Sequence, residues 1–302
     1  MVPAVGGVPL FVGVTPWILV AGVVAVCSAG YSDVPFCEWV YLVEFHGGVP
    51  FVSGWFMFYV DLGVGFWVCV VFIVNVVSYC LFGEGRRYTV NMLVNAELCG
   101  VFYPGWVVRV YFDDSVPFGV IGALGDFGYV ELVRRCDFFG ESRRLMRFLA
   151  VDDCDVVLCR DADSYVCERE VAAVDEWLLS GRSLHVMRDH VGHVRCVQAG
   201  MFGLRGGVLG MGGLVRDYIG RSVDCAGMDE EFLAECVYPR FVGDMVVHDD
   251  FGLYRDRTHR WPKPVVFYDG EGGFIGRRQF PPSIYVDRFR FYESVLECRR
   301  WV

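Results

Sequence analysis

The sequence predicts an α/β protein with a mainly parallel β-sheet flanked by helices, preceded by an apolar N-terminal region. Three observations support this. From Val70 onward, short runs of β-branched residues alternate with segments of helical spacing. These runs are apolar on both faces, as strands covered by helices on each side are. The first Lys or Arg in the chain is Arg86, so two regions of different composition are joined.

The charge balance bears on partners. The 302 residues carry 37 acids and 27 bases, a net charge of −10, with a pI near 5.1. A protein that binds duplex nucleic acid normally presents a basic face to the phosphates, so we expect no nucleic-acid partner. Arginine clusters or a metal ion can still hold a smaller anionic ligand.

The apolar region, residues 1–69, is expected to lie outside the α/β domain, which we place at 70–302. Val8–Ala29 contains no charged residue and is long enough to cross a bilayer. No Lys or Arg flanks it to give an orientation. A membrane anchor, an extension of no defined fold and a signal peptide therefore stay open, and the protein is expected to be membrane-associated or cytoplasmic.

The pattern from Val70 onward alternates strand and helix. The expected strands are Val70–Tyr79, Trp106–Phe112, Tyr129–Val133 and Asp155–Cys159, and the expected helices are Tyr88–Val101, Val116–Gly125, Glu141–Ala150 and Glu168–Leu179. Ligands of such sheets bind beyond the carboxyl ends of the strands. Chemistry is therefore to be sought where the strands end.

The fourth expected strand ends in Arg160-Asp161-Ala162-Asp163. Two carboxylates at this spacing can turn toward one Mg²⁺ or Mn²⁺ ion that also holds a diphosphate. The preceding helix carries three arginines, one of which could reach phosphate. The alternative is a solvated acidic turn.

A second polar segment, Leu184–His193, contains Arg188, Asp189 and His190. As a pocket wall, it would face a hydroxylated substrate, with Asp189 as a base or hydroxyl acceptor. As a structural feature, it would be a strand end with hydrogen-bonded histidines. Both interpretations stay open.

Two further segments carry candidate residues. Gly200 and Met201 lie in a glycine-containing stretch where the backbone could approach a ligand closely. Met245–Asp250 repeats the pattern of an apolar strand with a polar end, which makes His248 a third candidate metal ligand.

Together these residues resemble a glycosyltransferase family of the GT-A fold, of the uncharacterised type found in polysaccharide clusters and large viruses. The resemblance covers about Ser78 to Gly276. It is carried by Ser78–Gly83, Tyr103-Pro104-Gly105-Trp106, Arg147-Phe148, Arg160-Asp161-Ala162-Asp163-Ser164, His185–His190, Ala199–Gly203, Asp229 and His248-Asp249.

The resemblance implies a nucleotide-sugar donor whose diphosphate is held by a divalent cation on Asp161 and Asp163. It also implies a donor side formed by Leu81, Phe82, Gly83, Arg147 and Arg160, and an acceptor side formed by Arg188, His190, Gly200 and Met201.

The expected function is metal-dependent transfer of a sugar, with Mn²⁺ or Mg²⁺, to a hydroxyl of a glycan, lipid or protein. One alternative is a nucleotidyl- or phosphotransferase, although its usual phosphate loop is missing and Lys263 is the chain's single lysine. Another is a non-catalytic, membrane-associated scaffold with a degenerate transferase fold.

Overall fold

A computed structural model describes residues 20–28, 40–45, 58–61, 66–190, 192–249, 258–259, 276 and 286–299. The chain divides into two compact units, Met1–Ile73 and Val74–Val302. The division falls inside the predicted strand Val70–Tyr79. That run instead forms the end of one strand and most of another, separated by Ile73 and Val74.

The first unit contains a four-stranded antiparallel sheet in the order β2-β1-β4-β3. Its strands are β1 (Val20–Ser28), β2 (Val40–Phe45), β3 (Phe58–Asp61) and β4 (Phe66–Phe72). Strand β1 occupies the described part of the predicted membrane span Val8–Ala29, and the rest of that span lies outside the described residues. Within the described ranges, no helix is both long and apolar enough to cross a membrane.

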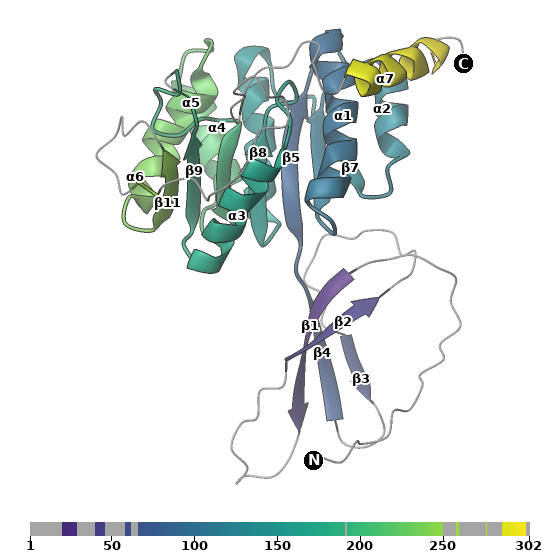
Figure 1. Ribbon diagram of the computed structural model, residues 1–302. Helices are drawn as coiled ribbons and strands as arrows, with labels where there is room; N and C mark the ends of the chain where they lie inside the picture. The colour runs from purple at the N-terminus through teal and green to yellow at the C-terminus, as the bar shows by residue number, and fades with distance from the viewer. Residues whose placement is uncertain are drawn as a thin grey trace. The chain divides into compact units, whose positions relative to one another are not determined.

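The second unit is built on an eight-stranded sheet in the order β12-β11-β9-β10-β8-β5-β6-β7 (Figure 1). Its strands are β5 (Asn75–Leu81), β6 (Val107–Phe112), β7 (Val130–Arg134), β8 (Val156–Arg160), β9 (Leu184–Arg188), β10 (Met201–Arg205), β11 (Met245–Asp249) and β12 (Thr258–His259). All neighbours are parallel except that β10 runs antiparallel to β8 and β9. The predicted α/β fold with a mainly parallel sheet is confirmed.

Helices cover both faces of this sheet (Figure 1). One core holds side chains of α1 (Arg86–Phe102), α2 (Phe118–Gly125), α3 (Glu168–Ser180) and α7 (Val286–Arg299). The other holds side chains of the 3-10 helix η1 (Gly140–Asp152), α4 (Met211–Arg221), α5 (Met228–Phe232), the π-helix η2 (Leu233–Val237) and α6 (Tyr238–Phe241). The predicted helix Glu141–Ala150 is thus a 3-10 helix.

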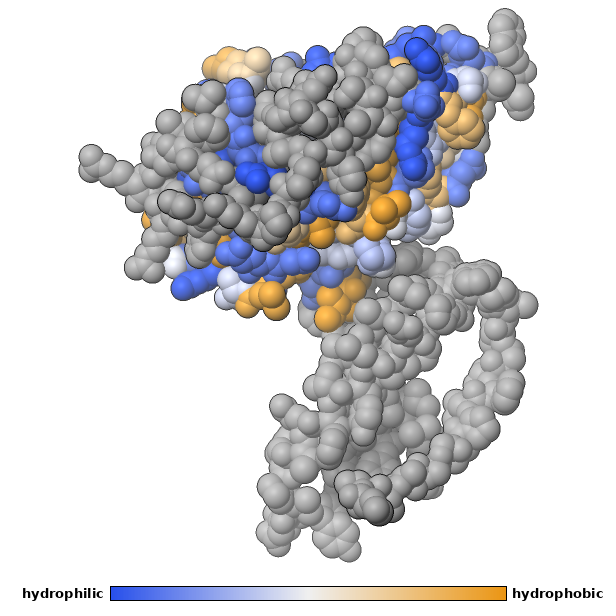
Figure 2. Space-filling view, viewed as in Figure 1, coloured by the Kyte–Doolittle hydropathy of each residue, from blue (hydrophilic) through white to orange (hydrophobic). Residues whose placement is uncertain are grey.

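The strands form where the sequence is apolar on both sides. In β5, Val76 packs into one core and Val77 into the other, and both are fully buried. Helix α3 begins with two acids in its first turn, where the helix dipole favours them, and ends at Gly181 in the left-handed conformation. On the face drawn in Figure 2, hydrophilic residues of the second unit are interspersed with small hydrophobic patches.

Strand β10 was not expected, because Gly203 at its centre and the glycines on either side of it favour a loop. A side chain at Gly203 would lie 2.7 Å from the ring of Trp177, which is fully buried on α3. The glycine therefore lets α3 pack closely against β10, inside a strand rather than in a ligand-binding loop.

Candidate functional site

The turn that follows β8 holds the two predicted acids in different surroundings. The Asp161 side chain is 40% exposed, and its Oδ1 accepts a hydrogen bond of 2.7 Å from Arg147 Nη1. The Asp163 side chain is 7% exposed, and its Oδ2 lies 2.6 Å from Arg87 Nη2. Both acids lie at the carboxyl end of β8, as predicted, but only Asp161 is substantially open.

Arg147, on η1, links Asp161 to a further acid. Its Nη2 donates a hydrogen bond of 2.8 Å to Asp229 Oδ2, and the guanidinium is almost fully buried. Burial alone disfavours the charged form, but the nearby carboxylates outweigh it, so the pKa of Arg147 is raised above its ordinary value. The site therefore contains a fixed positive charge between two carboxylates.

The first turn of α5 brings two acids to the same place. Asp229 is buried on Arg147, while Glu230 Oε2 lies 3.2 Å from Arg195 Nε. Burial and the neighbouring Asp229 raise the pKa of Glu230 above its ordinary value, with a further contribution from Asp161. Glu230 thus belongs electrostatically to the Asp161 cluster.

The end of β5 lies beside Arg147, because Arg147 Nη1 is 3.5 Å from Cys80 Sγ. Leu81 ends the strand and is buried, and Phe82 packs its ring under the Arg143 guanidinium at 4.5 Å. Gly83 has a φ of +77°, and its N–H donates a 2.6 Å hydrogen bond to Ser115 Oγ. This predicted donor-side segment therefore lies at the same sheet edge as Asp161.

Gly200 is next to Asp161, but the group that approaches its backbone is the Asp161 carboxylate. A Cβ atom at this position would overlap the carboxylate of Asp161. Met201 begins β10 directly opposite Arg160 and is buried. Gly200 is therefore needed to leave space for Asp161.

Arg160, which was predicted as a donor contact, is buried and binds groups of the protein itself. Its Nε donates a 2.7 Å hydrogen bond to Glu170 on α3, and its Nη1 donates to the carbonyls of Cys159 and Phe202 at 2.8 Å. Glu170 also accepts a 2.7 Å hydrogen bond from Tyr103. Arg160 is thus part of the buried frame of β8.

In the Leu184–His193 segment, the predicted site residues have protein partners. Asp189 is ion-paired with Arg169 through both carboxylate oxygens, at 2.7 and 2.9 Å. Arg188 is fully buried and donates to Asp249 at 2.7 Å. His190 Nδ1 accepts a 3.0 Å hydrogen bond from the backbone of Gly192. Since β10 lies between β8 and β9, Asp189 is two strands away from Asp161.

His248, the predicted third metal ligand, is not brought to the Asp161 turn. It lies on β11, three strands from β8, and its Nδ1 is 2.9 Å from Nε2 of His185. Its Nε2 faces Glu176 at 3.3 Å. Across the described ranges, no three His, Cys, Asp or Glu side chains are grouped to hold a metal ion.

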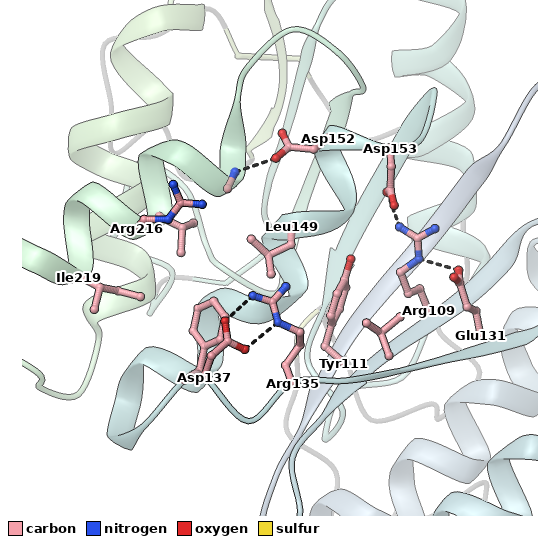
Figure 3. Close-up of a pocket in the computed structure, with 14 residues that line it drawn as sticks. Arg109, Tyr111, Glu131, Arg135, Asp137, Leu149, Asp152, Asp153, Arg216 and Ile219 are labelled. Atoms are coloured by element: carbon pink, nitrogen blue, oxygen red, sulfur yellow. Dashed lines mark hydrogen bonds and ion pairs between the residues drawn. The ribbon is translucent and has the colours of Figure 1, made fainter. Parts of the chain in front are cut away.

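A cavity of about 520 Å³ lies elsewhere in the second unit, among β6, β7, η1 and α4 (Figure 3). Arg109 is buried at its wall and pairs with Glu131 at 2.6 Å and with Asp153. Arg135 pairs with Asp137 at 2.6 Å. The cavity contains none of the predicted site residues, and most of its charges neutralise one another.

Three residues at the site were not predicted to have a role. Arg87 and Glu170 bind Asp163 and Arg160, and Asp229 binds Arg147. A signal for Arg87 existed in its spacing, since polar residues recur every four positions along α1.

No family model and no curated protein matches the chain. Solved structures do match in chain path, at low identity. The TarS 1–349 structure from S. aureus is 11% identical with a TM-score of 0.41, over 59% of this chain and 58% of that one. A mannosyltransferase from Pyrobaculum calidifontis, in complex with GDP-Man and Mn²⁺, is 15% identical with a TM-score of 0.40, over 63% and 57%.

A third match is the glucosyl-3-phosphoglycerate synthase of Mycobacterium tuberculosis, which is 12% identical with a TM-score of 0.41, over 75% of this chain and 79% of that one. This chain thus spans less than two thirds of the length of the first two structures. Likeness at this level gives no residue of this chain a role.

Proposed function

We propose that the second unit transfers a glycosyl group from a nucleotide-sugar donor to a hydroxyl acceptor on a glycan, lipid or protein. The observation that carries the proposal is the half-open Asp161 carboxylate beside the buried Arg147 guanidinium, at the carboxyl edge of a mainly parallel sheet. Ligands of such sheets bind at this edge. A carboxylate next to an arginine suits a diphosphate that arrives with a cation.

A divalent cation fits this site only when it is shared with the ligand. Mg²⁺ is usually held by one or two carboxylates together with substrate phosphates, rather than by an all-protein cage. Asp161 offers such a carboxylate, and a closed set of protein ligands is absent from the described ranges. When bound, Mg²⁺ or Mn²⁺ would neutralise charge on the departing nucleoside diphosphate.

Side chains of the protein would bind the donor and activate the acceptor. Arg147 would donate charge-assisted hydrogen bonds to the diphosphate, and the Gly83 turn would leave room for the donor beside β5. If the transfer inverts configuration, a base must take the proton of the acceptor hydroxyl. Glu230 fits that role better than Asp189. Glu230 belongs to the Asp161 cluster, and burial raises its pKa, although it also contacts Arg195, whereas Asp189 is two strands away with both oxygens on Arg169.

The test measures the binding of nucleoside diphosphates by isothermal titration calorimetry and by thermal shift, with and without Mn²⁺. We expect a Mn²⁺-dependent shift with UDP or GDP in the wild type, and its loss in Asp161→Asn. Asp217→Asn, an exposed acid on α4, serves as the control and should bind as the wild type does. No shift with any nucleotide would refute the proposal.

Product analysis separates glycosyl transfer from the nucleotidyl- or phosphotransferase alternative. A glycosyltransferase releases the nucleoside diphosphate from a nucleotide sugar. With a nucleoside triphosphate as substrate, release of pyrophosphate or transfer of its terminal phosphoryl group would instead identify the alternative.

A further inference from the structure

Helix α1 carries a row of polar side chains in addition to the apolar residues from which the helix was predicted. Arg87, Asn91 and Asn95 recur every four residues, so they lie on one face of the helix. Asn91 and Asn95 are fully buried, and Arg87 is partly buried. Polar side chains in a core need hydrogen-bond partners, so this stripe requires a polar surface opposite it.

All three residues of the α1 stripe contact the segment that follows Asp161. Arg87 Nη2 lies 2.6 Å from Asp163 Oδ2. Asn91 Oδ1 accepts a 2.6 Å hydrogen bond from the Tyr165 hydroxyl. Asn95 Nδ2 donates a 3.1 Å hydrogen bond to the Ala162 carbonyl. The stripe therefore holds the turn at three positions, Ala162, Asp163 and Tyr165.

We propose that the two acids of the Asp161–Asp163 turn have different roles: Asp163 is a positioning residue that anchors the turn to Arg87, and Asp161 is the acid that faces the ligand. The ligand's identity rests on the function proposed above. The anchoring itself does not.

The reason is the difference in surroundings. The Asp163 side chain is 7% exposed and is already paired with Arg87, so a cation would have to displace Arg87 to reach it. Asp161 is 40% exposed. A cation can reach it while Arg147 stays on Asp229.

The test compares four variants by chemical unfolding and by the affinity for a Mn²⁺–nucleoside diphosphate pair. The variants are Asp161→Asn, Asp163→Asn, Arg87→Gln and the Asp163→Asn/Arg87→Gln double variant. Arg86→Gln is the matched control, because Arg86 is the neighbouring arginine on α1 and pairs with Glu293 and Glu297 on α7. Arg87→Lys keeps the positive charge and tests whether that charge is enough to maintain the unfolding midpoint and the nucleotide affinity.

We expect Asp163→Asn and Arg87→Gln each to lower the unfolding midpoint, and the double variant to lose less than the sum of the two single losses. Each should weaken nucleotide affinity by about 10–100-fold, as is typical when a supporting residue of a metal site is removed. Asp161→Asn should remove Mn²⁺-dependent binding and leave the unfolding midpoint near that of the wild type. Arg86→Gln should leave nucleotide affinity unchanged.

Opposite results overturn the proposal. One is loss of Mn²⁺-dependent binding in Asp163→Asn while Arg87→Gln binds as the wild type does, since Asp163 would then be a ligand. Another is additive unfolding losses in the double variant. If the wild type binds no nucleotide, the proposed function fails, and the unfolding cycle alone still decides whether Asp163 is anchored. If Asp163→Asn does not fold, the unfolding midpoints of Arg87→Gln and Arg87→Lys are compared. A midpoint that is no higher in Arg87→Lys than in Arg87→Gln would overturn the proposal.

Discussion

Loss of the Glu170 carboxylate is expected to destabilise the second unit strongly. The Arg160 and Glu170 side chains are 3% and 2% exposed and lie 2.7 Å apart. Breaking a buried ion pair by removing one partner typically costs about 3–5 kcal/mol, because the other charge stays buried and unpaired. Glu170→Gln keeps the size of the side chain and removes the charge.

This loss is a large share of a typical unfolding free energy of about 5–15 kcal/mol. At about 2–4 °C per kcal/mol for a domain of this size class, the melting temperature should fall by about 6–20 °C. Urea unfolding monitored by circular dichroism measures the free energy directly, provided that the slope with denaturant stays constant.

The control is an exposed pair of similar geometry. Arg134 and Asp114 lie 2.5 Å apart with side chains 62% and 65% exposed, so Asp114→Asn should leave the urea midpoint and the melting temperature close to those of the wild type. A loss below about 1 kcal/mol in Glu170→Gln would refute the reasoning.

Three further predictions concern other positions. Gly200→Ala should abolish nucleotide binding in calorimetry by displacing the Asp161 carboxylate, while circular dichroism stays like that of the wild type. Burial lowers the pKa of His185, so below the ordinary histidine pKa of about 6.5 the unfolded chain binds more protons than the folded chain. The urea midpoint should therefore fall as the pH is lowered from about 6.5, and an unchanged midpoint would contradict this. Gly206→Ala should fold poorly, as measured by soluble yield and melting, because its Cβ would overlap the backbone carbonyl of Cys154.

Much of the second unit could be predicted because its elements have strong local patterns. Runs such as Val107-Val108-Arg109-Val110 are too apolar for anything but a buried strand, and each is bounded by turn residues. The direction of β10 could not be predicted. Strand direction depends on which neighbours it pairs with, and Gly203 reads locally as a loop residue although it serves helix packing.

The candidate site was only partly predictable, because sequence position does not tell where a side chain points. Asp161 lies at a strand end, where ligands are expected, and does so in the structure. His248 lies near the end of β11 and Asp189 follows β9, yet their side chains contact His185 and Arg169. Those partners are far away in sequence or on another element, so no local pattern reveals them.

The same argument explains why two acids two residues apart need not share a role. Their spacing places both in one turn, but the charges around each depend on the element packed against it. Arg87 on α1 meets Asp163, and Arg147 on η1 meets Asp161. Arg147 is also held by Asp229, so Asp161 can exchange this contact for a cation while the guanidinium keeps a partner. Asp163, by contrast, is paired with Arg87, and this pairing ties the turn to α1. Mutation of each acid should therefore have a different effect.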